Sequence, residues 1–291
     1  MEKEINEIVF KVYEGILKKD EAKRVPIINR IGLLFRYIIS GTLLKKSYVY
    51  QQLLKVNKFN EVKAKYTNYK YVVYTVVAGS YDEVKEPIYI NPNIDYYIFT
   101  DNHIPSDSMW KKIPISSIDS IKNYSFLEQA RYIKTHPQEF FEDYDYSMFI
   151  DGNIQITCDI MPLFNTVIAN NKSIAIHRHQ SRQCLYDEAK YVYVLKKAKL
   201  KEIKKQIKAY KKQGFPQKYG LFETNVIIRK HNEKICINVM DEWWNEIIKF
   251  TKRDQLSFTY ALWKNNLDSD YVLSLGNNSR RNPYFIVYNH K

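Results

Sequence analysis

The segment that most constrains this chain is a run of mostly apolar residues, 145–150, that ends in Asp151-Gly152-Asn153. A buried strand that releases polar side chains at its carboxyl end is where open α/β sheets place their ligands. Asp151 and Asn153 are hard oxygen donors of the kind that Mg²⁺ or Mn²⁺ uses beside phosphate oxygens. The alternative is a hairpin turn, since Asp-Gly and Gly-Asn are common turn pairs. Taken alone, the motif favours the turn.

Strand-like runs alternate with helical patterns from residue 66 onward. The sequence predicts strands at 71–77, 96–100, 145–151, 173–177 and 226–229. It predicts helices after the capping box Ser125–Glu128, after Asp159, over 200–210, around Trp243, and over 256–263. Alternation of this kind is typical of a three-layer α/β domain with a mostly parallel central sheet.

The first 65 residues form a separate predicted region. Apolar residues keep helical spacing over 3–18, and a second apolar stretch runs over 27–44. That stretch contains Arg30 and Arg36, each of which would cost a few kcal/mol at a bilayer centre, so a transmembrane span is rejected. It either packs as an ordinary helix, the favoured interpretation, or lies on a membrane surface through residues 27–46. The predicted division is therefore a helical region, 1–65, and an α/β domain, 66–291.

Composition narrows the classes of partner. The chain has 45 Lys and Arg against 32 Asp and Glu, a net charge of +13, which favours anionic partners such as nucleotide diphosphates, acidic lipids or nucleic acid. Three widely spaced cysteines and a charged start without a signal peptide predict a cytoplasmic location. Neither a P-loop nor a dinucleotide fingerprint is present. A phosphate-bearing ligand would therefore be held by a metal ion together with Arg and Lys.

A resemblance extends over about residues 70–264. It rests on Tyr74–Asp82, Ile98–Asp101, Arg131–Pro137 and Met148–Ile154, followed by His179–Arg182, Tyr186–Glu188, Gly220–Asn225 and Arg253–Phe258. In this order the segments resemble a glycosyltransferase-like family of plant mucilage-related proteins and bacterial polysaccharide loci. More distantly, the layout is similar to retaining GT-A galactosyltransferases and glycogenin. The family's metal motif is Asp-x-Asp, and here Asn153, a weaker ligand, takes the third position.

The resemblance implies a GT-A fold that transfers a sugar from a nucleotide-sugar donor to a glycan or lipid-linked glycan. It places the donor against Thr75, Ala78, Gly79, Tyr81, Asp101, Arg131, Lys134, His179 and Arg182. Local interpretations compete with these roles. Small residues after a strand are also an ordinary strand–loop junction, Asp101 also suits a turn, and Arg131 and Lys134 also suit a solvated helix face.

The resemblance also implies the catalytic and metal-binding residues. Catalytic roles fall on Asp254, Gln255 and Glu223, acceptor contacts on Asn225 and Glu188, and metal ligation on Asp151, Asn153 and His290. The competing interpretation of Asp254 is a helix N-cap, which capping alone would explain. An inverting reaction would need a carboxylate base, either Glu223, Glu188 or Asp254, whereas a retaining one would need none.

The resulting hypothesis is a glycosyltransferase that uses Mn²⁺ or Mg²⁺ and extends a surface polysaccharide or glycolipid. One alternative is a non-catalytic protein of the same fold that binds sugar nucleotides or polysaccharide. Another is nucleic-acid binding, prompted by the net charge and the nine lysines between Lys196 and Lys212. A lysine-rich helix with an apolar stripe is usually a solvated face, and no nucleic-acid motif accompanies it. We therefore predict no nucleic-acid partner.

Overall fold

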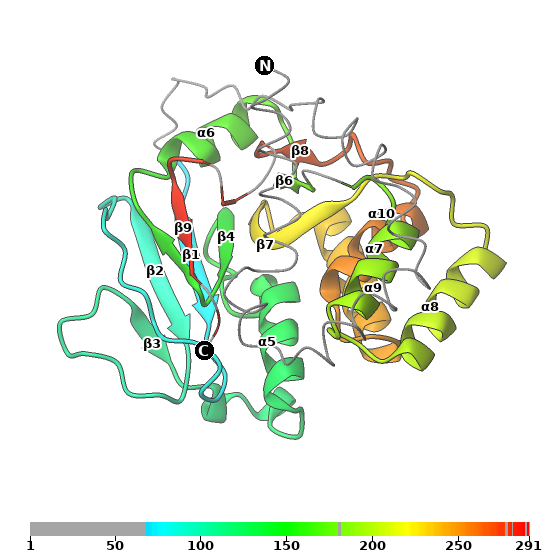
Figure 1. Cartoon of the computed structure of the whole chain (residues 1–291). Coiled ribbons are helices and arrows are strands. Elements are labelled where there is room, and N and C mark those ends of the chain that lie inside the picture. Colours follow the sequence, from blue (N-terminus) through cyan, green and yellow to red (C-terminus); the bar gives the residue numbers. More distant parts are fainter. Residues whose placement is uncertain (1–67, 180–181, 277–278, 281, 289, 291) are drawn as a thin grey trace, which may run out of the picture. The chain divides into compact units, whose positions relative to one another are not determined.

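The computed structural model describes residues 68–179, 182–276, 279–280, 282–288 and 290 (Figure 1). These residues belong to two compact units, one of which contains 182–220 and the other the rest. The predicted boundary at residue 65, the helices predicted within 3–44 and the proposed membrane contact at 27–46 lie outside the described residues. Among the residues described, no helix is long and apolar enough to cross a membrane.

The larger unit is built on a seven-stranded sheet of order β3-β2-β1-β4-β7-β6-β8. Its strands are β1 Tyr71–Val76, β2 Ile94–Phe99, β3 Lys111–Ile113, β4 Tyr146–Asp151, β6 Ile174–Arg178, β7 Phe222–Arg229 and β8 Leu273–Ser274. Every pairing in this sheet is parallel except those of β7, which runs against both β4 and β6. A small second sheet pairs β5 (Ile154–Ile156) with β9 (Phe285–Val287).

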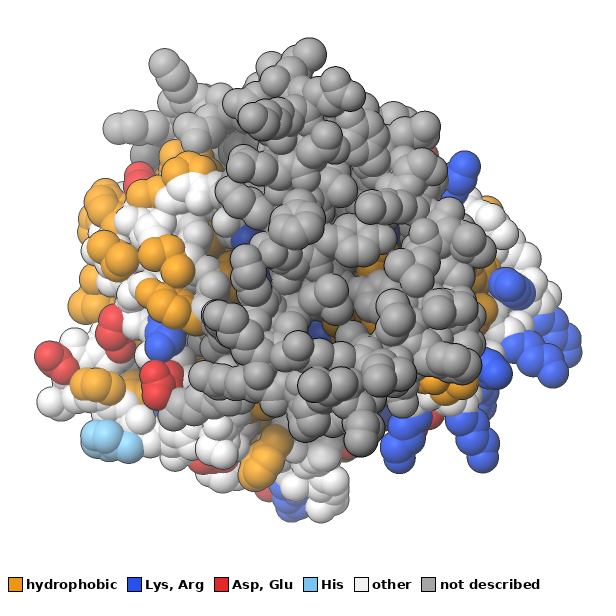
Figure 2. Space-filling model, viewed as in Figure 1, with side chains coloured by type: hydrophobic (Ala, Val, Ile, Leu, Met, Phe, Trp, Pro, Cys, Tyr) orange, Lys and Arg blue, Asp and Glu red, His pale blue; other side chains and the backbone are white. Residues whose placement is uncertain are grey.

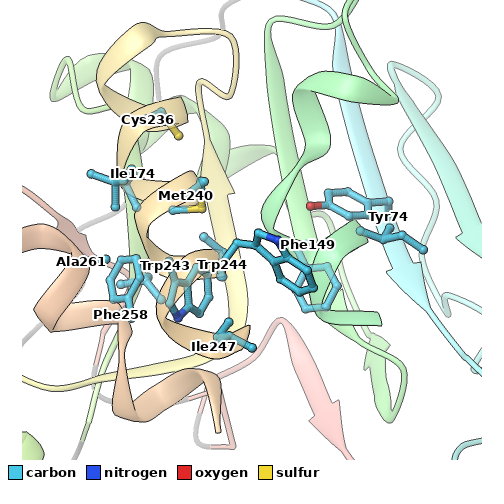
Figure 3. Packing of buried hydrophobic residues seen from close by; sticks show 14 of the residues in the cluster. Tyr74, Phe149, Ile174, Cys236, Met240, Trp243, Trp244, Ile247, Phe258 and Ala261 are labelled. Carbon is cyan, nitrogen blue, oxygen red and sulfur yellow. The ribbon is translucent and has the colours of Figure 1, made fainter. Parts of the chain in front are cut away.

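Side chains of β1 enter two different cores, because successive residues of a strand point to opposite faces of the sheet. Val72 and Tyr74 join a cluster with residues of α5 (Phe126–Thr135), α9 (Lys234–Lys249) and α10 (Phe258–Lys264) (Figure 3). Val73 joins a second cluster with residues of α6 (Met161–Ala169). The sheet thus has helices on both faces, which confirms the predicted three-layer α/β class with a mostly parallel sheet.

Helix α5 begins and ends where the sequence predicts. The Ser125 hydroxyl accepts from the Glu128 amide at 3.4 Å, and the Glu128 carboxylate accepts from the Ser125 amide at 3.1 Å. This reciprocal capping box satisfies two amides that the first turn of a helix leaves without intrahelical partners. The helix stops at Thr135, before Pro137. Four short 3₁₀ segments complete this unit: Ile115–Ser117, Asp119–Ile121, Pro137–Glu139 and Asp254–Leu256.

The reversed direction of β7 decides which residues reach the ligand edge of the sheet. Ile150, the next-to-last residue of β4, pairs with Val226, the fifth of the eight residues of β7. Residues at the beginning of β7, rather than at its end, therefore lie beside Asp151. The 3₁₀ segment Asp254–Leu256 and α10 follow later in the chain, and α10 begins at Phe258, two residues after the predicted start.

The smaller unit contains α7 (Leu185–Val194), which the sequence analysis did not predict, and α8 (Leu200–Lys212), which it did. Helix α8 buries Ile203, Gln206 and Tyr210. Its exposed lysines are Lys201, Lys204, Lys205, Lys208, Lys211 and Lys212. Blue side chains gather over this helix in Figure 2. A buried stripe and a charged outer surface match the solvated helix face that the sequence favours over a nucleic-acid site.

Candidate active site

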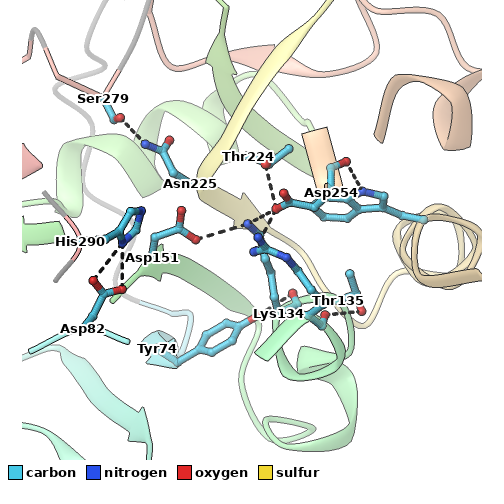
Figure 4. Close-up of polar contacts among 12 residues, drawn as sticks. Tyr74, Asp82, Lys134, Thr135, Asp151, Thr224, Asn225, Asp254, Ser279 and His290 are labelled. Atoms are coloured by element: carbon cyan, nitrogen blue, oxygen red, sulfur yellow. Dashed lines mark hydrogen bonds and ion pairs between the residues drawn. The ribbon is translucent and has the colours of Figure 1, made fainter. Parts of the chain in front are cut away.

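A buried cluster of opposite charges lies at the carboxyl edge of the sheet (Figure 4). Lys134 from the last turn of α5 donates to Asp254 Oδ2 at 2.6 Å, and its Nζ lies 3.4 Å from Asp151 Oδ1. Arg131 Nη1 lies 3.2 Å from the same Asp254 oxygen. The sequence places Arg131 and Lys134 on one helix face, and the structure shows that this face is turned inward. The interpretation of the two as solvated surface charges is therefore wrong.

The Asp254 carboxylate binds side chains from distant parts of the chain and does not cap a helix. The structure records no side-chain capping bond at the start of either Asp254–Leu256 or α10. Instead, Asp254 Oδ2 accepts from the Thr224 hydroxyl at 3.0 Å, and the Asp254 carbonyl accepts from the Trp243 indole at 2.8 Å. Burial alone would raise the pKa of Asp254, but the nearby charges of Arg131, Lys134 and Arg253 hold it well below its usual range. Asp254 is consequently ionised at neutral pH.

A second layer of contacts holds Lys134 in place from below. Its backbone carbonyl accepts from Arg229 Nη1 at 2.7 Å and from the Tyr74 hydroxyl at 3.0 Å, and Arg229 also bonds to Tyr74. This carbonyl lies at the end of α5, where such oxygens have no partner within the helix. Arg229 is fully buried, and no carboxylate among the described residues forms an ion pair with it. Its charge instead faces the negative end of the helix dipole.

The Asp151-Gly152-Asn153 turn is packed tightly against the end of β1. A Cβ at Gly152 would lie 2.8 Å from a Val77 methyl carbon and 3.1 Å from the Val76 carbonyl, so a side chain there would clash. Asn153 is buried, and its Nδ2 donates to the Tyr288 carbonyl at 2.6 Å. The strand after this turn, β5, pairs with β9 and not with β4. The turn is therefore not a hairpin connection.

His290 lies beside this turn, paired with a carboxylate that the sequence analysis did not single out. Its Nδ1 is 2.9 Å from Asp82 Oδ1, and its ring centroid is 4.7 Å from that of Tyr81 (Figure 4). Asp82 Oδ2 would in turn lie 3.5 Å from a Cβ at Gly152. In the part of the chain that the structure describes, no three His, Cys, Asp or Glu side chains form a preassembled metal site.

The end of β1 contains the small residues expected at the donor. Gly79 adopts φ +63°, a conformation that favours glycine, and its carbonyl accepts from Asn102 Nδ2 at 2.6 Å. Ala78 packs on the core, while the buried Thr75 hydroxyl has no hydrogen-bond partner among the described residues. Asp101 Oδ1 accepts from the Ser116 amide at 2.9 Å and from the Ser116 hydroxyl at 2.7 Å, and its predicted role at the donor stays a prediction.

The predicted acceptor-side residues are less closely grouped. Asn225 donates to the Ser279 hydroxyl at 2.6 Å, and Gln255 donates to the Phe222 carbonyl at 2.9 Å. Glu223 is half-buried in β7, opposite His177 of β6. Burial lowers the pKa of His177 to about 4, so its buried ring is neutral.

The remaining predicted donor residues lie where the larger unit ends and in the smaller unit. The His179 amide donates to the Leu221 carbonyl at 2.8 Å, which joins the two chain segments that flank residues 180–220. Arg182 and Glu188 belong to the smaller unit and pair with each other, and the Arg182 guanidinium lies 3.9 Å from the Tyr191 ring centroid. Their predicted roles with donor and acceptor stay predictions.

Three residues that contact the site or support it were not singled out from the sequence. Asp82 stands at the end of the Tyr74–Asp82 segment and could have been noticed there as a carboxylate next to a glycine loop. Thr224 lies between Glu223 and Asn225 in β7. Because successive side chains of a strand point to opposite faces, the sequence could have indicated that Thr224 points away from these two residues. Arg229 closes an apolar strand, and nothing local in the sequence indicates that it is buried.

Residues 54–290 match the family described as TOD1/MUCI70, glycosyltransferase-like domain. The chain belongs to this family. The match includes both the buried charge cluster and the turn at Asp151, and the α/β architecture agrees with the GT-A type that the resemblance implies.

One relative and one solved protein illustrate the likeness. The chain is 25% identical over 248 residues to "Probable hexosyltransferase MUCI70" of Arabidopsis thaliana, with 76% of this chain and 42% of that protein covered, so it spans less than half of its relative. The mannosyltransferase Ktr4p from S. cerevisiae, in a crystal structure with GDP, has 13% identity and a TM-score of 0.44. That comparison covers 80% of this chain and 78% of the Ktr4p chain.

Proposed function

We propose that this protein is a metal-dependent glycosyltransferase that moves a sugar from a nucleotide-sugar donor to a glycan or lipid-linked glycan of the cell surface. The observation that carries this proposal is the pair Arg131 and Lys134, held in a buried cluster beside Asp151 at the carboxyl edge of the sheet. Ligands of open α/β sheets bind at that edge. Membership of a glycosyltransferase-like family and the name of the Arabidopsis relative agree with it.

The charge balance of this edge favours an anionic ligand. Arg131, Lys134 and Arg253 lower the pKa of Asp254, and Lys134 also lies 3.4 Å from Asp151, so three basic side chains face the two carboxylates Asp254 and Asp151. The site therefore has an excess of positive charge. This charge is partly buried, and salt screens buried charges less than charges on the surface. A diphosphate is complementary to this excess, and Arg131 would bind its oxygens with the directional bonds that a guanidinium provides.

The residues around Asp151 fit a small divalent cation. Asn153 uses its nitrogen on the Tyr288 carbonyl, which leaves Oδ1 as its acceptor, and Asp151 adds a carboxylate. His290 pairs through Nδ1 with Asp82, an arrangement that leaves Nε2 available as a ligand and is common for metal-bound histidine. Asp151, Asn153 and His290 would hold Mn²⁺ or Mg²⁺ together with donor phosphates. When bound, the ion would neutralise the departing diphosphate as a Lewis acid.

Asp254 is better suited to electrostatic positioning than to proton transfer. Its pKa lies well below the usual range because three basic groups surround it, and such a weak base does not take a proton efficiently near neutral pH. We propose that Asp254 and Gln255 orient the donor sugar, directly or through Lys134. If configuration is inverted, Glu223 is the better candidate for the base within the larger unit. A retaining reaction would need no base.

Donor binding is tested by calorimetry with UDP and with GDP, in Mn²⁺ and in EDTA. We expect much weaker binding in EDTA and for Asp151→Ala, because the cation and its first ligand are then lost. Asp119→Ala is the matched control, since the Asp119 side chain is 93% exposed. Equal affinity under all of these conditions would contradict the metal-dependent site.

Catalysis is tested with a panel of sugar nucleotides in Mn²⁺, with donor hydrolysis or transfer as the readout. Asp254→Asn keeps the size of the side chain but removes the charge that Lys134 and Arg131 face. We expect most of the turnover to be lost while the variant remains folded at neutral pH. Turnover near that of the wild type would exclude Asp254 from the site.

A peripheral membrane contact is part of the proposal for a lipid-linked acceptor. It rests on the apolar stretch within residues 27–46, which carries Arg30, Arg36, Lys45 and Lys46. Basic residues near an anionic surface contribute about 1 kcal/mol each. Sedimentation with phosphatidylglycerol vesicles should show binding of the full chain that falls as salt rises, and weaker binding of a chain beginning near Lys65. Absence of vesicle binding at low salt would exclude the contact.

A further inference from the structure

Phe126, the first residue of α5, is an aromatic side chain in an unexpected environment. It is 63% exposed, although phenylalanine is usually buried. Its ring lies against Gly79, because a Cβ built at Gly79 would be 3.0 Å from Phe126 Cδ2. Gly79 adopts φ +63° directly after β1, at the same sheet edge as Asp151. An exposed ring therefore rests on the glycine loop beside the candidate active site.

The same helix presents two different chemistries to this edge. Phe126 stands in its first turn, and Arg131 and Lys134 stand in its last turns, where they meet Asp254 and Asp151. Residues 126 and 134 are about 12 Å apart along the axis, given a rise of 1.5 Å per residue. A flat apolar surface at one end and buried cations at the other match the two ends of a nucleoside diphosphate.

We propose that Phe126 is the stacking platform for the base of the nucleotide donor, with the Gly79 loop beneath the ring. The inference rests on the proposed function, because it assigns the base end of the same donor whose diphosphate meets Arg131 and Lys134. Every base has a π-face, so stacking on an aromatic ring strengthens binding with little dependence on the identity of the base.

Tyr81, the other aromatic residue near this loop, is also 63% exposed, so the two rings differ in what packs against them rather than in exposure. The Tyr81 ring packs against the His290 ring at a centroid distance of 4.7 Å, so one side of it is already occupied. None of the aromatic ring contacts recorded among the described residues involves Phe126. The absence of a side chain at Gly79 is what allows the ring to lie this close to the loop.

The experiment compares two ligands that carry a base with one that does not. Affinities of UDP, GDP and inorganic pyrophosphate are measured by calorimetry in Mn²⁺ for the wild type, Phe126→Ala and Phe126→Trp. Leu127→Ala is the matched control, because Leu127 is the next residue of the same turn and is 47% exposed. Phe126 is mostly exposed, so its removal leaves the core unchanged, and thermal unfolding verifies this.

We expect Phe126→Ala to weaken the binding of UDP and GDP by similar factors, between about fivefold and 150-fold, since stacking contributes about 1–3 kcal/mol per base. Pyrophosphate affinity should not change, Phe126→Trp should retain nucleotide affinity, and Leu127→Ala should resemble the wild type. Unchanged nucleotide affinity in Phe126→Ala would overturn the platform and leave the proposed function intact. An equal loss for pyrophosphate would also overturn it. A wild type that binds neither nucleotide would overturn both.

Discussion

Two side-chain contacts that each involve a carboxylate flank the Asp151 turn, and they differ in how deeply they are buried. In the Lys134–Asp254 cluster, made of Arg131, Lys134, Thr224 and Asp254, the exposed fractions of the Lys134, Asp254 and Arg131 side chains are 1%, 5% and 15%. In the His290–Asp82 pair, 45% of the His290 side chain and 9% of the Asp82 side chain are exposed. Both contacts join distant parts of the chain, residues 134 and 254 in the first and residues 82 and 290 in the second.

This difference in burial indicates which contact is part of the rigid scaffold and which can be replaced by a ligand. Removing one partner of a buried ion pair leaves an uncompensated charge in a medium that solvates it poorly. A pair with one solvated partner has water as a substitute, so it can give up its geometry to a ligand at little cost. The Lys134–Asp254 cluster therefore fixes the position of the cations, while the His290–Asp82 pair is free to adjust to an incoming ion.

The largest expected effect is that of Lys134→Met on stability. This change leaves the buried Asp254 carboxylate without its closest partner, and we expect a loss of about 3–5 kcal/mol in the free energy of unfolding. Chemical denaturation is the measurement. Lys122→Met is the control, since the Lys122–Asp119 pair is 62% and 93% exposed and should contribute less than about 1 kcal/mol. A similar, small loss in both variants would contradict the comparison.

Asp254→Asn should change how stability depends on pH. The pKa of Asp254 is lower in the folded chain than the value of about 3.9 in an unfolded one, so its contribution is fully present above that value and is lost as pH falls. The free energy of unfolding of the wild type should therefore exceed that of Asp254→Asn by a constant amount from pH 8 to 5. This difference in stability should narrow below pH 5. Denaturation at several pH values measures this. A constant difference down to pH 3 would show that Asp254 is not stabilised as an anion.

Asp82→Asn tests whether the His290–Asp82 pair contributes to metal binding rather than to the stability of the fold. If Asp82 orients His290 for a metal, its loss should weaken Mn²⁺ affinity by about 10- to 100-fold, as is usual for a carboxylate behind a metal-bound histidine. Calorimetry with Mn²⁺ in the presence of UDP or GDP is the measurement. Affinity equal to that of the wild type would limit Asp82 to a structural role.

The smallest expected effect is that of His290→Ala on stability. Because the imidazole is nearly half exposed, we expect less than about 1 kcal/mol of change in the free energy of unfolding. The same variant should lose much of its Mn²⁺ affinity. A loss of several kcal/mol in stability would place the His290–Asp82 pair with the scaffold, contrary to the comparison.

The local features of this chain could be read from its sequence. The Ser125–Glu128 capping box, the apolar strand before Asp151 and the apolar stripe of α8 all appear where the sequence predicts them. Each depends on residues within one or two turns or along one strand, so spacing is enough to specify it. The family resemblance also selected Arg131, Lys134, Asp151 and Asp254, which the structure brings together.

Helix α7 and the short strands β3, β8 and β9 could not be read in this way. The short strands have two or three residues each, too few for a periodic pattern, and they exist because a neighbouring strand supplies their hydrogen bonds. The direction of β7 within the sheet could not be read from the sequence either. No local signal distinguishes a parallel from an antiparallel strand when both of its faces are buried.

By itself, the sequence determined the α/β class, the strand that ends at Asp151 and the helix face that carries Arg131 and Lys134. Only the tertiary structure decided that Asp254 faces those cations instead of capping a helix, and that Asp82 pairs with His290. The physical reason is distance along the chain. A cap depends on neighbours three residues away, whereas the environment of Asp254 is set by a lysine 120 residues earlier, which the reversal of β7 and the packing of α5 bring within 2.6 Å.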